Sequence, residues 1–296
     1  MELRHLRCFL AVAEELHFAR AAERLHIEQS PLSRTIKELE EDLGEQLFVR
    51  TSRSTKLTRA GKLFLEHVPR IFTALQQARD SVQAAANGFH GQLRIALSDG
   101  ITPSRLPALL ALCRQEEPEV EIRLFEVPLS QQIKGLHDDL YDVGFAQSDE
   151  VGDRVVAMPA WSDTLMVAVP ARHPLLVHKR IPLDALLRYP LVLCDPQVCE
   201  GYCHQLAQLL QPLEHKPNVV EHASSLDMML TLVGAGYGVG FTTTTRIAGY
   251  QRPDVVIRPL AMESAVITTY LLWSENSSMS VSLERFIARL RDRLGD

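Results

Sequence analysis

The stretch "EQSPLSRTIKELEEDLG", Glu28 to Gly44, decides the fold of the N-terminal part of the chain. Apolar residues recur at helical spacing along one side of it: Leu32, Ile36, Leu39 and Leu43. The other side carries hydrogen-bonding groups first (Gln29, Ser30, Ser33, Arg34 and Lys37) and acids afterwards (Glu38, Glu40, Glu41 and Asp42). Ser30 is a suitable N-cap, and Pro31 suits the first helical position. The stretch therefore predicts an amphipathic helix whose charges run against the usual preference of the helix dipole.

The residues before this stretch predict two further helices. Leu3, Leu6, Leu10 and Ala13 recur at helical spacing, and residues 17–27 place Ala21, Ala22 and Leu25 on one face. Two short helices joined by a tight turn form a helix-turn-helix, in which the N-terminal part of the second helix reaches base edges in the major groove. Phosphate would repel the acidic second half, so we expect it to point away from DNA. The alternative is a solvated face on an ordinary bundle helix.

The positive charge of the chain is concentrated just after this helix. The formal net charge is −6, from 31 Lys and Arg and 37 Asp and Glu. Residues 1–62 hold 11 of these bases and 10 of these acids, so the remaining 234 residues hold 20 and 27. Residues 47–49 and 56–58 are typical of two short strands, and residues 47–62 contain no acid and five bases: Arg50, Arg53, Lys56, Arg59 and Lys62. A basic hairpin beside a recognition helix is a wing, whose cations can lie on phosphates or enter a minor groove.

Residues 18–61, "FARAAERLHIEQSPLSRTIKELEEDLGEQLFVRTSRSTKLTRAG", resemble the DNA-binding signature of LysR-type transcriptional regulators. The match runs from about Leu3 to Gly61; Ala19 departs from it, because a hydroxyl residue is frequent there. The resemblance assigns Gln29, Ser30, Pro31, Ser33 and Arg34 to the groove, and Arg50 and Arg53 to the wing; Lys37 can also bond bases or phosphates. It implies a sequence-specific regulator of transcription, not an enzyme, that binds double-stranded DNA, assembles as a dimer or tetramer and contacts RNA polymerase.

A long linker helix is predicted over residues 58–88, after the DNA-binding domain of residues 1–61. Its apolar residues are spaced alternately by four and three: Phe64, Val68, Ile71, Leu75, Ala78, Val82 and Ala85. Two helices that bury such a seam form a coiled coil, and the symmetry of the dimer predicts an inverted repeat in the DNA. The alternative is a single helix packed on its own domain. Pro69 lacks an amide donor, so we expect a kink there.

Residues 91–296 predict an α/β domain. Strand patterns such as "LRIAL" (93–97) and "VEIRLFEV" (120–127) alternate with helical patterns, which indicates parallel sheets covered on both faces. We expect one lobe at about 91–161 and 267–296 and a second at about 162–266. The family resembled has such a two-lobed domain, similar to periplasmic solute-binding proteins, with a small-molecule effector in the cleft.

Ligands of open α/β sheets bind beyond the carboxyl ends of the strands. That rule selects Ser98, Thr102, Ser130, Gln147, Cys194, Asp195 and Thr242. Several of these match effector-contacting positions in the family; Leu129 departs, because a hydroxyl residue is often found there. We expect these eight residues to bind a small, anionic effector. The alternative for each residue is a helix cap or an ordinary loop position.

Other motifs exclude some classes of function. "GAGYGVG" (234–240) ends a helix and enters a strand, so it is not a dinucleotide loop, and no nucleophile–base pair indicates catalysis. Cys199 and Cys203 lie four residues apart beside His204, without the second pair that a zinc site needs. We therefore expect no cofactor and no metal. The chain has five cysteines, no apolar run long enough to span a membrane, and no signal peptide, as expected of a cytoplasmic protein.

The cysteines also support a second hypothesis about function. A peroxide-sensing branch of the family carries a reactive cysteine in the loop where Cys199 lies. The alternative to a ligand-responsive regulator is therefore a redox-responsive one that senses through Cys199 and Cys203. Glu200 beside Cys199 disfavours a thiolate, and the two side chains would be parallel on one helix, which would strain a disulfide.

Overall fold

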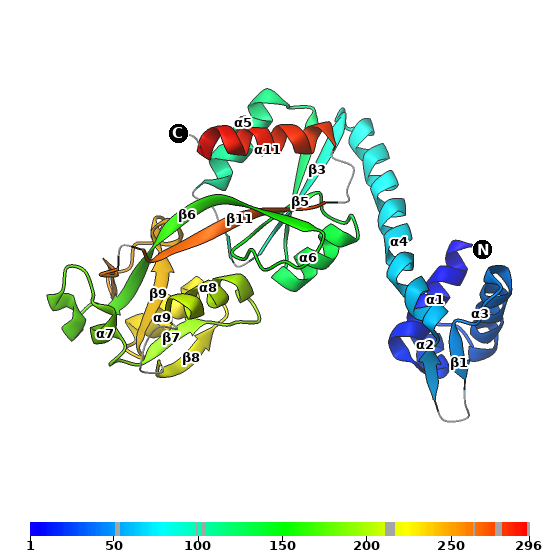
Figure 1. Ribbon diagram of the computed structural model, residues 1–296, viewed down its shortest axis with the longest axis horizontal. Coiled ribbons are helices and arrows are strands. Elements are labelled where there is room, and N and C mark those ends of the chain that lie inside the picture. The colour runs from blue at the N-terminus through cyan, green and yellow to red at the C-terminus, as the bar shows by residue number, and fades with distance from the viewer. Residues whose placement is uncertain are drawn as a thin grey trace. The chain divides into compact units, whose positions relative to one another are not determined.

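A computed structural model of the chain describes residues 1–50, 54–98, 100–101, 105–210, 217–262, 264–275 and 280–294. These residues pack into two compact units, Met1–Asp80 and Ser81–Asp296. Both units are drawn in Figure 1. No described helix combines the length and the apolar composition needed to cross a membrane.

The N-terminal unit is a winged helix-turn-helix, as predicted. Its elements are α1 (Leu3–Glu15), α2 (Phe18–Arg24), α3 (Gln29–Leu43), β1 (Phe48–Arg50), β2 (Thr55–Leu57) and most of α4 (Arg59–Ala86) (Figure 1). Phe9 lies at the centre of its core, with ring centroids 5.4 Å from Phe48 and 4.9 Å from Phe64. These contacts fasten the hairpin and the start of α4 to α1.

The prediction that Ser30 caps α3 is wrong. The helix begins at Gln29, and the extended backbone of Glu28 (φ −76°, ψ 153°) makes Glu28 the N-cap residue. Ser30 and Pro31 are therefore the second and third helical residues. Proline is tolerated there because the first amides of a helix have no carbonyl partner within it.

The two strands of the wing also differ by one residue from their predicted limits. The antiparallel register pairs Phe48 with Leu57 and Arg50 with Thr55. Thr58, predicted as the last strand residue, instead lies just before α4 and caps its first turn. Its hydroxyl accepts the N–H of Gly61 at 2.9 Å and donates to the carbonyl of Gln46 at 2.7 Å.

Helix α4 divides the predicted seam into two parts. Val68 is fully buried and Phe64 packs beside it, both in the core of the N-terminal unit. These two positions are therefore covered by their own domain, as the alternative of a lone packed helix required. Further along, the seam residues Ile71 and Val82 are 36% and 71% exposed, and Ala78 and Ala85 are exposed too. The helix continues through Pro69.

The C-terminal unit is built on a mixed sheet. Its described strands are β3 (Gly91–Leu97), β4 (Val120–Glu126), β5 (Val143–Ala146), β6 (Val155–Pro170), β7 (Leu191–Cys194), β8 (Val219–Ala223), β9 (Val239–Thr243), β10 (Val255–Pro259) and β11 (Val266–Ser274). The order is β4-β3-β5-β11-β6-β9-β7-β8, with β10 also paired to β6. The parallel pairing predicted from the alternating pattern is correct for two groups of strands. Strand β3 is parallel to β4 and β5, and strand β7 is parallel to β8 and β9. The long strands β6 and β11, and the unpredicted β10, are antiparallel to their neighbours.

Strand β6 joins the two lobes. Its first part, residues 155–164, pairs with β11, and its last part, residues 165–170, pairs with β9 and β10. The division expected near residue 161 falls within this strand. The chain therefore changes lobes along a continuous hydrogen-bonded strand.

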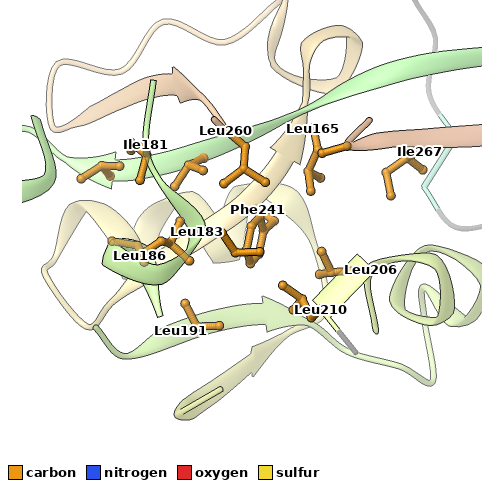
Figure 2. Packing of buried hydrophobic residues seen from close by; sticks show 14 of the residues in the cluster. Leu165, Ile181, Leu183, Leu186, Leu191, Leu206, Leu210, Phe241, Leu260 and Ile267 are labelled. Atoms are coloured by element: carbon orange, nitrogen blue, oxygen red, sulfur yellow. The ribbon is translucent and has the colours of Figure 1, made fainter. Parts of the chain in front are cut away.

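Helices cover the faces of both lobes. They are α5 (Leu106–Glu116), α6 (Leu129–His137), the 3-10 turn η1 (Pro174–Val177), α7 (Leu183–Leu186), α8 (Glu200–Leu210), α9 (Leu226–Gly234), α10 (Thr244–Ile247) and α11 (Val281–Leu294). Phe286, Ile287 and Leu290 of α11 pack with Leu93 and Ile95 of β3, so the final helix returns to the first lobe as predicted. In the second lobe, α7 and α8 supply leucines that pack around Phe241 of β9, as Figure 2 shows.

Candidate functional site

Helix α3 has a polar face opposite its buried residues. Leu32, Ile36 and Leu39 have no exposed surface. The predicted groove residues lie on the other side: Gln29, Ser30, Pro31, Arg34 and Lys37 are exposed, and Ser33 is half-buried. This face therefore presents hydroxyl, amide and guanidinium groups over the first half of the helix, the kinds of group that bind base edges and phosphates.

The acids in the second half of α3 lie close to basic groups of the same unit. The pairs are the Met1 ammonium with Asp42 (2.7 Å), His5 with Glu38 (3.5 Å), Lys37 with Glu41 (3.4 Å) and Arg50 with Glu40 (2.9 Å). They tie the end of α3 to the N-terminus of the chain and to the wing. Sequence reasoning explained these acids by phosphate repulsion alone and missed their partners, most of which are far away in sequence.

The wing holds the remaining predicted DNA contacts. Arg50, in β1, turns back towards α3: its guanidinium lies 4.6 Å from the centre of the Phe18 ring and close to Ser33 and Glu40. Lys56, in β2, is exposed. Arg53 lies outside the described residues.

A cleft of about 800 Å³ lies in the C-terminal unit. Its described wall is formed by Ser98 and Gly100, by Glu126–Pro128, by Gln197–Cys199, by Ser224–Asp227, and by Thr245, Arg246 and residues 248–250. These segments follow, or lie at, the carboxyl ends of β3, β4, β7, β8 and β9, in both lobes. The cleft therefore has the position and the size expected of a small-molecule site in an open α/β domain.

Most of the residues predicted to bind the effector do not line this cleft. Of the eight, Ser98 belongs to its described wall, and Thr102 lies outside the described residues. Leu129, Gln147, Cys194 and Thr242 are buried, and Ser130 is exposed on α6. The Asp195 carboxylate accepts the N–H of Gln197 at 2.8 Å and so shapes the loop after β7.

The difference has a common physical reason. After β7 and β9 the chain runs on for a few residues before it faces the cleft, so Cys199 and Arg246 take the places predicted for Cys194 and Thr242. On the β4 side the wall is formed before α6 begins, by Glu126–Pro128. The end of β7 at Cys194 was predicted correctly, but β9 continues to Thr243 and so includes Thr242, which was expected to follow a strand. The length of each connection was not readable from the pattern either.

Arg246 is the cationic side chain of the described cleft wall, and sequence reasoning missed it. It is half-buried, and its guanidinium lies 5.0 Å from the centre of the fully buried Tyr202 ring. Nη2 is 3.9 Å from the Sγ of Cys199. Gly100 has φ +59°, a backbone conformation that favours glycine, and a Cβ there would come within 2.7 Å of the same nitrogen and displace the end of the Arg246 side chain.

The cysteines below the cleft form a hydrogen-bonded pair. A hydrogen bond to Cys194, together with burial, raises the pKa of the Cys199 thiol far above its ordinary value. The same bond, assisted by Arg246 and opposed by burial, lowers the pKa of Cys194. Both sulfurs are nearly inaccessible to solvent, because Cys194 and Cys199 are each only 3% exposed. This geometry does not favour Cys199 as a peroxide-reactive thiolate, and Cys203 donates to the carbonyl of Cys194 at 3.4 Å.

Gln205 of α8 connects the two lobes. Its amide nitrogen donates to the carbonyls of Gln147 and Thr268, both at 2.7 Å, and its oxygen accepts the N–H of Thr268 at 2.9 Å. Gln147 directly follows β5 in the first lobe, whereas α8 belongs to the second lobe. Both ends of this amide therefore hold the second lobe to the first, a contact with no signal in the local sequence pattern.

Comparisons with known proteins match the whole chain. The family model of "Bacterial regulatory helix-turn-helix protein, lysR family" matches residues 3–62, and that of "LysR substrate binding domain" matches residues 86–295. The chain is 32% identical over 295 residues to the uncharacterized HTH-type transcriptional regulator YnfL of Escherichia coli (strain K12), with 99% of both chains covered. It is 32% identical over 298 residues to the Hca operon transcriptional activator HcaR of the same organism, with coverage of 99% and 98%. The crystal structure of full-length CbnR complexed with its target DNA is similar with a TM-score of 0.72, at 26% identity over 99% of both chains.

Proposed function

The chain belongs to the LysR family of bacterial helix-turn-helix regulators, and from this membership we propose how it binds DNA and its effector. It is a DNA-binding transcriptional regulator with an effector-binding C-terminal domain. The exposed face of α3 enters the major groove, and the residues in contact with DNA are Gln29, Ser30, Pro31, Ser33, Arg34 and Lys37, with Arg53 from the wing. CbnR, a similar protein whose structure was solved in complex with its target DNA, supports the binding of DNA.

The effector is a small anion held in the cleft between the lobes. The observation that carries this proposal is the half-buried guanidinium of Arg246 in the cleft wall. The described wall residues of the same lobe are otherwise largely apolar or carry hydroxyl groups. The acids of the wall, Glu126 and Asp227, are exposed at the surface, where solvent screens them. An anionic group of the effector would bind Arg246, and its body would pack on residues such as Val127 and Val198.

Binding of the effector would be coupled to the separation of the lobes. The two walls are joined by β6, β11 and the Gln205 hydrogen bonds, so they can move only within limits. A ligand that contacts both walls stabilises the arrangement in which both contacts form. That shift in population is the signal that the regulator transmits to its DNA-binding units.

The regulator would act as a symmetric dimer or tetramer. A coiled coil along the second half of α4 is supported by the exposed seam residues Ile71, Ala78 and Val82, which are seven and then four residues apart. Two recognition helices related by a two-fold axis would bind an inverted repeat. RNA polymerase is a further partner that this function implies.

Selection of DNA from a random pool tests the proposed function. The full chain, immobilised, should enrich duplexes that contain an inverted repeat, and footprinting on an enriched duplex should change when the correct carboxylate from a panel is added. A wild-type chain that enriches no sequence over many rounds would contradict the DNA-binding role. An unchanged footprint with a carboxylate that demonstrably binds the chain would contradict control by the cleft.

A further inference from the structure

Arg50 was assigned to the wing as a phosphate contact, but its surroundings indicate another role. We propose that Arg50 is a positioning residue, held by Glu40, that fixes the wing and Ser33 of α3 relative to each other for base recognition. The inference rests on the proposed insertion of α3 into the major groove.

Glu40 is the anchor of this arrangement. Its side chain is only 12% exposed, although it lies on the charged side of α3. Oε1 accepts the backbone N–H groups of Leu47 at 2.9 Å and Phe48 at 3.1 Å, which are the amides where the chain enters β1. Oε2 accepts from Nη2 of Arg50 at 2.9 Å. One carboxylate therefore joins the recognition helix, the start of the wing and the arginine.

The guanidinium of Arg50 is engaged on several sides. It lies over the ring of Phe18 at 4.6 Å, Nη2 donates to Glu40, and Nη1 reaches the hydroxyl of Ser33 at 3.4 Å. Each terminal nitrogen thus already donates one hydrogen bond within the unit, which directs the guanidinium towards α3 and Glu40. The nearby Glu40 carboxylate would also repel a phosphate. The contact of Arg50 with Ser33 instead orients a hydroxyl that faces the groove.

Removal of the Glu40 charge separates this role from a phosphate contact. In Glu40→Gln, the amide oxygen still accepts from the backbone of β1, but the charge that holds Arg50 is lost. Arg50 can then turn to the DNA backbone and leave Ser33 unoriented. We expect affinity for random-sequence DNA to rise, the slope of log K against log salt to become steeper by about 0.9, and the preference for the selected sequence to fall about tenfold.

The experiment uses the full chain, a duplex selected by the wild type and a random-sequence duplex of equal length. Glu45→Gln is the matched control, since Glu45 is exposed just after α3 and its change removes the same charge without releasing Arg50. Arg50→Gln and Arg50→Lys complete the set. Thermal melts of all four variants establish that the DNA-binding unit remains folded.

The expected result is a loss of sequence preference in Glu40→Gln, Arg50→Gln and Arg50→Lys but not in Glu45→Gln, with the salt slope of Arg50→Gln equal to that of the wild type. The inference is overturned if Arg50→Gln flattens the slope by about 0.9 while Arg50→Lys keeps wild-type preference, because a phosphate contact needs only the charge. Equal behaviour of Glu40→Gln and Glu45→Gln overturns it as well. If Glu40→Gln does not fold, the two Arg50 variants decide alone. A wild type that selects no duplex refutes the proposed function instead.

Discussion

Replacement of Arg246 by glutamine should weaken binding of an anionic effector. The guanidinium is the cation of the described cleft wall. It lies 5.0 Å from the centre of the Tyr202 ring and next to Gly100. Glutamine is shorter and neutral, so it removes a charge-assisted hydrogen bond and leaves the apolar part of the cleft intact. Arg252→Gln is the matched control, because Arg252 lies in the same lobe, outside the described cleft wall, and is paired with Asp254 at 2.7 Å.

The size of the effect follows from the lost hydrogen bond. A hydrogen bond to a charged group contributes about 1.5–3 kcal/mol, which corresponds to about 10- to 150-fold in Kd. At a concentration of 100 times Kd, a ligand stabilises the native state by about 2.7 kcal/mol. A Kd weakened about 30-fold would reduce that stabilisation to about 0.9 kcal/mol. At about 2–4 °C per kcal/mol, the increase in Tm would fall from about 5–11 °C to about 2–4 °C.

Thermal shift of the full chain with a panel of small carboxylates measures this difference. The wild type and Arg252→Gln should show the full increase in Tm with the same carboxylate, and Arg246→Gln the reduced one. Calorimetric titration would then give the two values of Kd. A carboxylate that binds Arg246→Gln as tightly as the wild type would refute the assignment of Arg246 to the anionic group.

Three further predictions concern assembly, stability and redox chemistry. Val82→Glu should dissociate the dimer by placing like charges in the exposed seam, whereas Gln83→Glu, one residue off the seam, should not; unchanged sedimentation of the full-length Val82→Glu protein would contradict the coiled coil. Burial alone would raise the pKa of Glu117, but hydrogen bonds from Arg289 and Arg285 lower this pKa below its ordinary value of 4.5. The ionised carboxylate therefore stabilises the fold above about pH 4.5, and this contribution is lost as the pH falls through the lowered pKa. Arg289→Met should therefore lower the free energy of unfolding by about 2 kcal/mol at pH 7 and by less at pH 3, and an equal loss at both values in denaturant titrations would contradict the pairing. The raised pKa of Cys199 keeps it a thiol at neutral pH, so peroxide should leave the DNA footprint unchanged; an oxidant-dependent shift that Cys199→Ser abolishes would reverse this conclusion.

The sequence by itself determined the features that depend on local periodicity. The buried stripe of α3 through Leu32, Ile36 and Leu39, the length of α4 and most strands of the α/β domain were readable, because burial imposes a period of 3.6 or 2 residues on the chain. Strand β10 was not predicted. The winged helix-turn-helix followed from these elements and from the concentration of bases after residue 47. The return of α11 to the first lobe was also visible, in its apolar face through Phe286 and Leu290.

The tertiary structure decided which groups meet. Asp42 pairs with the ammonium of Met1 and Glu40 with Arg50, and no periodic pattern encodes these pairs because the partners are distant in sequence or lie around a turn. The cleft wall was misplaced by a few residues because periodicity fixes neither the last residue of a strand such as β9 nor the length of the connection after it. Arg246 lies at the cleft on α10, which begins at Thr244 directly after β9, and only the tertiary structure decides that position.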